Sequence, residues 1–249
     1  MQTMGGAMYI LAPRCANNLR HSQPDSSNLG VAGYITLAFS STTYHISHGY
    51  VPPPAQTHDG PATLNQRLKA HIAARGLTVS PQLYLLRQLT NWITAARSRD
   101  VNIITGGDFN MDPTTPRGLT LQHWAQNLAL TNISDQHAAT CAPMTHMLGG
   151  IPRSRIDHIY ADVNCQAALA CVDVLYEPLT TACSDHCPIY ASFQCPSIGS
   201  HTRPLPKPPP SSRLELPYRN STILALYQAE MDAWTTQHDS TSADIDPRT

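Results

Sequence analysis

The hydrophobic and polar positions along the chain predict an alternation of strands and helices. Residues 7 to 12 form a short apolar run, and residues 30 to 50 alternate apolar and polar positions on both sides of a break at Ser40 and Ser41. Alternation with a period of two is typical of strands with one buried face. We therefore predict a strand from Gly30 to Phe39 that turns into a second strand from Thr42 to Tyr50.

Three later stretches have helical spacing instead. Ala62 to Arg75 is a short candidate closed by Gly76, and Gly118 to Leu128 is another. Pro81 to Arg99 is the strongest, because Pro81 suits a first helical turn and the apolar residues fall on one stripe. That stripe, which indicates packing rather than chemistry, consists of Leu85, Leu86, Leu89, Trp92, Ile93 and Ala96.

Five short apolar runs complete the expected strands: Val101 to Thr105, Leu130 to Ile133, Arg155 to Tyr160, Ala168 to Tyr176 and Cys187 to Gln194. Strands and helices that alternate in this way indicate an α/β domain, which we place at residues 1–195. The next segment, 196–217, is rich in proline and predicts an extended linker. Residues 218–249 contain an amphipathic helix, Ser221 to Trp234, and a polar tail.

Composition limits the function classes without choosing one. The 249 residues, 41% of them hydrophobic, suffice for one sizeable core, and the net charge of −1 provides no broad positive field for nucleic acid. Residues 26–58 lack charged side chains, but polar residues interrupt them too often for a membrane span. No basic residue precedes the apolar run 7–12, so a secretion signal is not expected. We expect a soluble, intracellular protein without a membrane partner.

The seven cysteines do not form a recognisable metal motif. Five of them lie between residues 165 and 195, and no two have the Cys-x-x-Cys spacing of a zinc site. We expect reduced thiols in the core.

Candidate chemistry is concentrated in three stretches in which an aspartate adjoins an apolar run. They are Gly106-Gly107-Asp108-Phe109-Asn110, Ser154-Arg155-Ile156-Asp157-His158-Ile159 and Cys183-Ser184-Asp185-His186-Cys187. Polar residues at strand ends often carry catalytic side chains, and three such ends could bring together Asp108, Asn110, Asp157, Asp185 and His186. The structural alternative is that these residues form turns and that Asp157 is ion-paired with Arg155 or Arg153.

In this order, the three motifs resemble those of the endonuclease/exonuclease/phosphatase superfamily, which includes deoxyribonuclease I-like enzymes. Among its branches, the endonucleases of non-LTR retrotransposons are the most similar, because Ser154 to Ile159 and the upstream Met144-Thr145-His146 both fit their pattern. The resemblance implies an α/β fold of two mixed β-sheets packed face to face with outer helices. It implies nucleic acid, specifically DNA, as the substrate.

The resemblance also implies roles for individual residues. Asp108 would orient or deprotonate the attacking water, Asn110 would hold it, and His186, oriented by Asp157, would stabilise the phosphoryl oxygens. Asp185 would approach a Mg²⁺ or Mn²⁺ ion. Tyr50, in Gly49-Tyr50-Val51-Pro52, would touch the phosphate, although an aromatic residue that covers the core is an equal alternative. Substrate contacts are implied for Thr145, Arg155 and Ser184, whereas His137 and His146 are expected to be loop residues rather than ligands.

The sequence departs from the family pattern at its beginning. The family opens with strands that carry an asparagine and a glutamate, the principal metal ligand, but the only glutamates here are Glu177, Glu215 and Glu230, all after Tyr50. Asp25 lies in a polar, turn-like stretch and is a poor substitute. We therefore expect a domain without its first strands and an endonuclease that is weak or inactive, nuclear if it is a functional retrotransposon product. The alternatives are a non-enzymatic decayed fragment and a phosphatase or phospholipase of the same fold.

Overall fold

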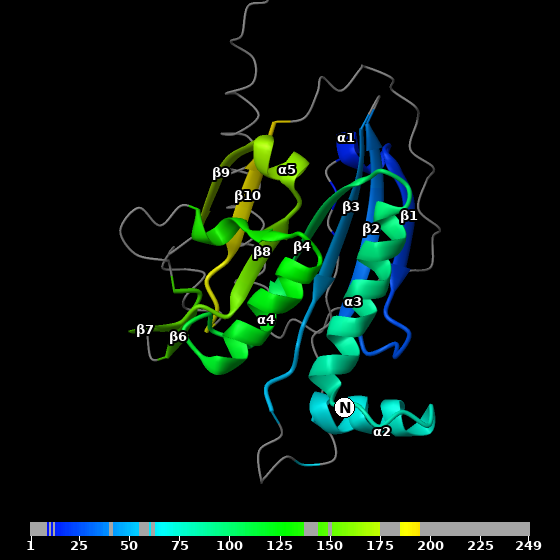
Figure 1. The fold of residues 1–249 in the computed structure, drawn as a ribbon, viewed down its shortest axis with the longest axis vertical. Coiled ribbons are helices and arrows are strands. Elements are labelled where there is room, and N and C mark those ends of the chain that lie inside the picture. Colours follow the sequence, from blue (N-terminus) through cyan, green and yellow to red (C-terminus); the bar gives the residue numbers. More distant parts are fainter. Residues whose placement is uncertain are drawn as a thin grey trace, which may run out of the picture. The chain divides into compact units, whose positions relative to one another are not determined.

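The computed structural model describes residues 9, 11, 13–39, 42–54, 60, 63–136, 144–148, 151–174 and 185–194 (Figure 1). The chain separates into two compact units, residues 1–205 and 206–249. The whole second unit, the expected linker and the expected helix at 221–234 lie outside the described residues.

A six-stranded mixed sheet in the order β1-β2-β3-β4-β8-β5 is the centre of the first unit (Figure 1). Its strands are β1 (Leu19–Pro24), β2 (Ala32–Phe39), β3 (Thr42–Gly49), β4 (Asn102–Asp108), β5 (Thr131–Asn132) and β8 (Asp157–Ala161). The antiparallel pair β2 and β3 confirms the strands predicted from residues 30–50. β4 runs parallel to β3 and antiparallel to β8.

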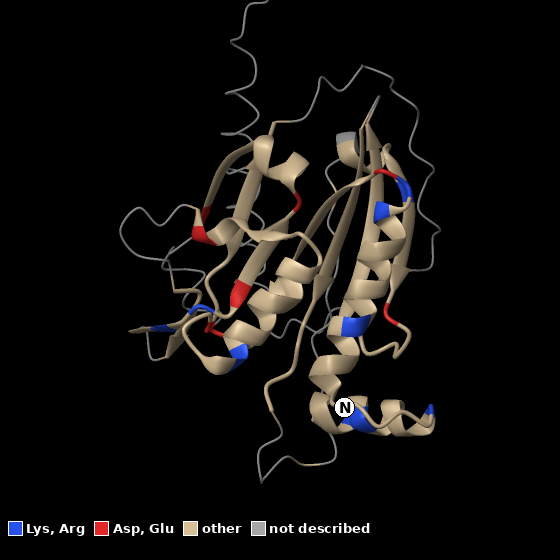
Figure 2. Ribbon diagram, in the orientation of Figure 1, with Lys and Arg blue, Asp and Glu red and all other residues tan. Residues whose placement is uncertain are grey.

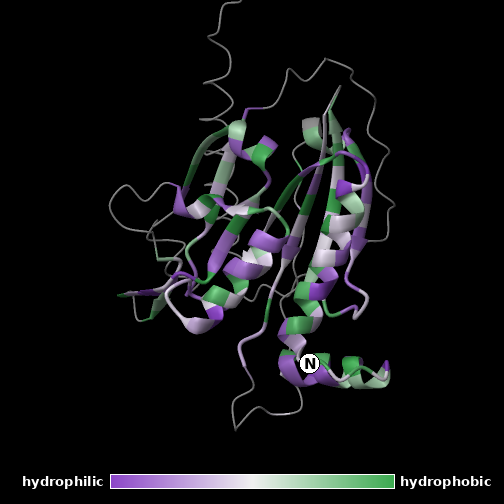
Figure 3. Ribbon diagram, in the orientation of Figure 1, coloured by the Kyte–Doolittle hydropathy of each residue, from purple (hydrophilic) through white to green (hydrophobic). Residues whose placement is uncertain are grey.

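Helices cover one face of this sheet. They are α2 (Leu64–Ala74), α3 (Pro81–Arg97) and α4 (Pro116–Asn127). Each begins after a residue whose hydroxyl accepts a backbone N–H of the first turn, namely Thr63, Ser80 and Thr115. All three helices were predicted to within a few residues, and the stripe of α3 packs into a core with Ile103 of β4 and Leu121 of α4. Figure 3 shows the mixture of hydrophobic and hydrophilic positions along α3 and along β2 and β3.

The opposite face of the sheet packs against a second, two-stranded sheet. This sheet pairs β9 (Leu169–Val174) with β10 (Ile189–Phe193), and the short helix α5 (Val163–Ala167) precedes it. Ile35, Leu37 and Tyr44 of the large sheet share a core with Leu169 and Phe193 of the small one. Two sheets face to face with helices outside confirm the fold class.

Six of the described elements were not predicted, one of them the short helix α5. The helix α1 (Pro13–Ala16) and the strand β1 precede β2, the 3₁₀ turn η1 (Ile133–Asp135) follows β5, and a hairpin of β6 (His146–Leu148) and β7 (Ile151–Ser154) occupies the stretch expected to be loop. In the predicted strand 7–12, only Tyr9 and Leu11 are described, and neither is in a strand. Within the described residues, no helix is long and apolar enough to cross a membrane.

Gly107 allows β3 and β4 to approach closely just before Asp108. Its φ is 142°, and a Cβ atom there would lie 2.0 Å from the carbonyl oxygen of Gly49. No other residue type fits this position without displacing the end of β3. Gly76, which ends α2, also has a positive φ of 69°, but a Cβ atom there would meet nothing within 4 Å.

These glycines give a graded stability prediction. Gly107→Ala combines backbone strain with a clash against backbone, so we expect it to lower the free energy of unfolding by about 3 kcal/mol or more. Gly76→Ala adds strain alone and should cost about 1 kcal/mol. Gly60→Ala, where the added Cβ would meet nothing within 4 Å, is the control and should change stability by less than about 0.5 kcal/mol. Urea unfolding checks this order, and equal effects at residues 107 and 76 would contradict it.

Candidate active site

The loop after β4 holds Asp108 and Asn110 against the end of β3. One carboxylate oxygen of Asp108 accepts the backbone N–H of Asn110 at 2.9 Å, and the carbonyl oxygen of Asp108 accepts the N–H of Val51 at 2.8 Å. The Asn110 side chain donates to the Val51 carbonyl at 3.0 Å. Asn110 has a φ of 50°, a left-handed conformation that asparagine tolerates better than most residues. The loop is therefore fixed beside Val51 and its neighbour Tyr50.

Asp157 is the direct cross-strand partner of Asp108. The two residues face each other where β4 and β8 pair, and the N–H of Phe109 donates to the Ile156 carbonyl at 2.9 Å. Carboxylates opposite each other on paired strands repel. This arrangement requires a compensating positive charge.

His186 supplies that charge. Its Nδ1 donates to Asp157 Oδ2 at 2.9 Å, and its Nε2 lies 3.9 Å from Asp108 Oδ2. The hydrogen bond with Asp157 raises the pKa of His186 to about 9, helped by the charge of Asp157 and then of Asp108. The ring is therefore an imidazolium at neutral pH.

The surroundings of Asp108 favour its neutral form, whereas those of His186 favour its charged form. Burial, followed by the negative charge of Asp157, raises the pKa of Asp108 to about 6, although hydrogen bonds from Asn110 and the charge of His186 act in the other direction. A carboxylate with such a pKa is suited to accept a proton near neutral pH.

Tyr50 belongs to the same cluster. Burial and the charge of Asp108 raise the pKa of its hydroxyl, Asp185 adds to this effect, and a hydrogen bond with Asn110 opposes it. The phenol is thus protonated and able to donate a hydrogen bond within the site.

Thr145 lies beneath the cluster, fully buried. Its hydroxyl accepts the backbone N–H groups of Ile156 and Asp157 at 3.1 and 3.0 Å, and its carbonyl accepts the N–H of Cys187 at 2.7 Å. Through these hydrogen bonds, Thr145 connects the segment that carries Asp157 with the segment that carries His186. The structure therefore gives Thr145 a positioning role inside the protein rather than an exposed contact.

Arg155 is also engaged inside the protein. Its backbone N–H donates to Asp112 Oδ2 at 2.9 Å, and its guanidinium forms an ion pair with Asp135. Arg155 is thus paired with Asp135, whereas the Asp157 carboxylate is bonded to His186. Ser184, Cys183 and His137 lie outside the described residues.

Two histidines near the cluster were not predicted to have roles there. His158 is fully buried in β8, its Nε2 donates to the Met111 carbonyl at 3.0 Å, and its Nδ1 accepts from Asn132 at 3.1 Å. The bond to Met111 holds the loop after Asp108 against β8. His146 lies in β6, where its ring centroid is 5.4 Å from that of His186 and its Nε2 is 3.9 Å from Asp185 Oδ2. The only sequence signal for His146 was its position next to Thr145.

The carboxylates fit a small divalent cation. Oxygens of Asp108 and Asp157 lie within 4.8 Å of each other and of a His186 nitrogen, and the Asp185 side chain is 72% exposed. His186, as an imidazolium bonded to Asp157, is not counted as a ligand. Carboxylate oxygens are the ligands that Mg²⁺ and Mn²⁺ prefer. Three carboxylates outweigh the one imidazolium, so the site attracts a cation and repels a bare phosphate. Figure 2 shows the basic residues scattered over several elements.

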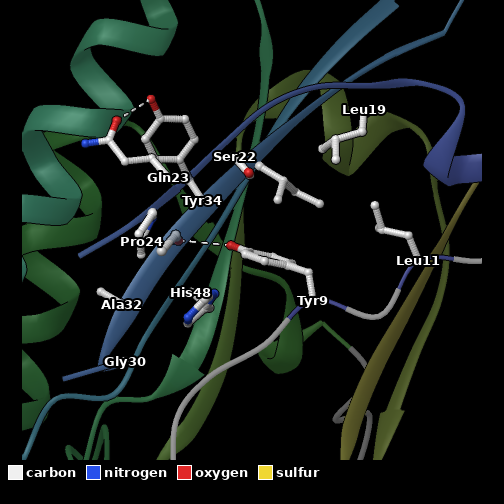
Figure 4. Close-up of a pocket in the computed structure, with 12 residues that line it drawn as sticks. Tyr9, Leu11, Leu19, Ser22, Gln23, Pro24, Gly30, Ala32, Tyr34 and His48 are labelled. Carbon is white, nitrogen blue, oxygen red and sulfur yellow. Dashed lines mark hydrogen bonds between the residues drawn. The ribbon is translucent and has the colours of Figure 1, made fainter. Parts of the chain in front are cut away.

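A separate cavity of about 350 Å³ lies beside β1, β2 and β3 (Figure 4). Leu11, Leu19 and Ile35 line it, and the Tyr9 hydroxyl closes one side through bonds of 2.9 Å with the carbonyls of Gly33 and Ile46. None of the clustered carboxylates lines this cavity. The candidate chemistry is at the strand ends instead.

Two face-to-face sheets with an acidic cluster and a charged histidine at the strand ends define the deoxyribonuclease I-like class of fold. The sequence profile of the Endonuclease/Exonuclease/phosphatase family matches residues 18–186. The chain belongs to that family.

Solved structures show the same fold. An AP endonuclease from Archaeoglobus fulgidus is 11% identical, with 72% of this chain and 71% of that chain covered and a TM-score of 0.50. A 3′ phosphatase from Neisseria bound to a product DNA hairpin is 18% identical over 71% and 72% of the chains, with a TM-score of 0.47. The endonuclease domain of TRAS1, a telomere-specific non-LTR retrotransposon, is 15% identical over 72% and 70%, with a TM-score of 0.45. A search of curated proteins finds no match.

The His186 pairing predicts a specific pH dependence of stability. Because the folded pKa of about 9 exceeds the ordinary 6.5, the imidazolium stabilises the fold fully below pH 6.5 and progressively less as the pH rises through about 9. The difference in melting temperature between the wild type and His186→Asn should therefore shrink between pH 6.5 and pH 9.5. Thermal melts at four pH values in this window measure it. Parallel curves for the two proteins would show that the ion pair is absent.

Proposed function

We propose that this protein is a metal-dependent phosphodiesterase that cleaves nucleic acid, an endonuclease of the non-LTR retrotransposon type. The observation that carries the proposal is the arrangement of Asp108, Asp157 and His186, which sets a carboxylate of raised pKa beside a carboxylate-oriented imidazolium. Hydrolysis of a phosphodiester requires both an acceptor for the proton of water and positive charge near the phosphoryl oxygens.

Asp108 is the proposed proton acceptor. Its Oδ1 is fixed by the Asn110 backbone, which leaves Oδ2 directed toward the space near His186. A water held there by Asn110 and Asp108 would lose its proton to Asp108 as it attacks phosphorus. The raised pKa makes this carboxylate a stronger base than an exposed aspartate.

His186 and Tyr50 are the proposed donors to the phosphoryl oxygens. Asp157 occupies Nδ1 of His186, so Nε2–H is the hydrogen that can point to substrate. The Tyr50 hydroxyl, kept protonated by its surroundings, would donate a second hydrogen bond. When bound by Asp185 and its neighbours, Mg²⁺ or Mn²⁺ would neutralise the phosphate and stabilise the leaving oxygen.

Two observations support nucleic acid as the substrate. First, the family contains nucleases and phosphatases, and the motifs around Thr145 and Asp157 resemble those of its retrotransposon endonucleases. The second observation is a structural similarity. The structurally similar Archaeoglobus fulgidus protein is described as an AP endonuclease. We expect slow cleavage, because the described residues provide no glutamate as a principal metal ligand.

Plasmid nicking tests the proposal. With Mg²⁺ or Mn²⁺, the wild type should convert supercoiled DNA slowly to the nicked form, and Asp108→Asn should reduce the rate by about 10²-fold or more, because the proton acceptor is lost. His186→Ala should cost about 10²–10³-fold. Asp100→Asn is a matched control, since Asp100 is exposed and has a φ of 53° that asparagine also tolerates.

Two results would redirect the proposal. Turnover of a phosphomonoester or a phospholipid faster than DNA would assign the phosphatase or phospholipase alternative. Nicking that is equal in the wild type and in Asp108→Asn would mean that the activity does not come from this site.

The two perturbed pKa values predict a bell-shaped pH profile. The metal-dependent rate should rise as Asp108 ionises through about pH 6 and fall as His186 loses its proton through about pH 9. Measurement of kcat/KM on a short labelled duplex between pH 5 and pH 10 checks both limbs. In Asp157→Asn the alkaline limb should move to lower pH, because His186 loses its main partner; an unmoved limb would refute the assignment.

A further inference from the structure

The hairpin β6–β7 brings a second imidazole to the exposed carboxylate of the site. His146 Nε2 lies 3.9 Å from Asp185 Oδ2, a separation too long for a hydrogen bond. Ligand bonds of about 2.1 Å from each atom would span it with an angle of roughly 135° at the ion, between the adjacent and the opposite positions of an octahedron. A small rotation of the exposed Asp185 carboxylate would bring the pair to the spacing of two ligands of one ion.

The surroundings of His146 hold its ring in this orientation. Ser154 Oγ lies 3.3 Å from Nδ1, which leaves Nε2 as the free ligand atom. A second polar group on the other ring nitrogen is the usual support of a metal-binding histidine. The His146 side chain is 26% exposed and that of Asp185 is 72% exposed, so water and a phosphate could occupy the remaining coordination positions.

The backbone fixes the two ligands relative to each other. His146 and His186 form an antiparallel bridge, the N–H of Met147 donates to the Asp185 carbonyl at 2.7 Å, and the N–H of Cys187 donates to the Thr145 carbonyl at 2.7 Å. The ligand pair is thus part of the same hydrogen-bonded unit as the Asp157–His186 pair. No glutamate is present among the described residues to compete for the ion.

We propose that His146 and Asp185 together hold the divalent cation of this protein, and that the imidazole ligand makes the site select a transition-metal ion such as Mn²⁺ over Mg²⁺. Nitrogen ligands favour first-row transition metals, whereas Mg²⁺ prefers oxygen ligands and water. This inference rests on the proposed function, which needs a cation at the same site but does not require its nitrogen ligand.

Metal binding, measured without substrate, tests the inference separately from activity. By calorimetry, the full-length protein should bind Mn²⁺ about tenfold or more tightly than Mg²⁺, and His146→Ala should remove most of that preference. Electron spin-echo spectroscopy of bound Mn²⁺ should show modulation from a coordinated ¹⁴N that is lost in His146→Ala. His123→Ala, which removes an exposed histidine of α4, is the matched control and should keep both properties.

The outcomes separate the inference from the proposed function. Retention of the ¹⁴N modulation and of the Mn²⁺ preference in His146→Ala overturns the inference, even if Mg²⁺-dependent nicking is normal. If His146→Ala does not fold, as judged by circular dichroism, Ser154→Ala decides, because loss of the ring's second partner should weaken Mn²⁺ binding about tenfold and leave Mg²⁺ binding less affected. Unchanged Mn²⁺ binding in Ser154→Ala counts against the inference, as does a wild type without ¹⁴N modulation.

Discussion

The repulsion between two carboxylates on adjacent strands is the constraint on which the site depends. Asp108 and Asp157 are register partners at the ends of β4 and β8, and the pairing itself costs free energy while both are ionised. His186 offsets that cost, because it donates to Asp157 and lies within 4 Å of Asp108. The charge of Asp157 helps to keep a proton on His186 and adds to burial, the larger cause, in raising the pKa of Asp108, whereas the charge of His186 lowers it. The electrostatic compensation is therefore partial, and Asp108 remains a stronger base than an ordinary aspartate.

The carboxylate pair can form only because the surrounding backbone fixes the strand ends. Gly107 lets β4 run close to Gly49, and the Val51 N–H then meets the Asp108 carbonyl. On the other side, the hydroxyl of buried Thr145 accepts the N–H of Asp157, and its carbonyl accepts the N–H of Cys187, directly after His186. Positioning residues therefore lie on both sides of the cluster, and none of them needs to touch a substrate to matter for its geometry.

The sequence predicted the parts of this structure that have a local signal. The apolar–polar alternation in residues 32–49 repeats along two whole strands, and the apolar stripe of α3 repeats over several helical turns. These repeats allowed β2, β3 and α3 to be predicted. β1 was missed because all six of its residues are exposed, and an exposed edge strand has no apolar alternation. The hairpin β6–β7 was missed for the same reason, since most of its residues are exposed. The meeting of Asp108, Asp157 and His186 was suggested by their positions at strand ends and by resemblance to a family, because cross-strand register over dozens of residues has no local signature.

The histidines show why amino-acid composition alone could not identify the candidate site. The chain has 12 histidines, and the environment of each sets its charge. Burial lowers the pKa of His45 to about 4, and that of buried His158 also falls, so both remain neutral parts of the core. His186 is less buried, and its bond to Asp157 outweighs desolvation, so its pKa moves in the opposite direction. The residue type is the same in all three cases. What distinguishes the candidate catalytic histidine is a carboxylate partner at hydrogen-bond distance, and that partner is provided by the register of β4 and β8 together with the bonds of Thr145.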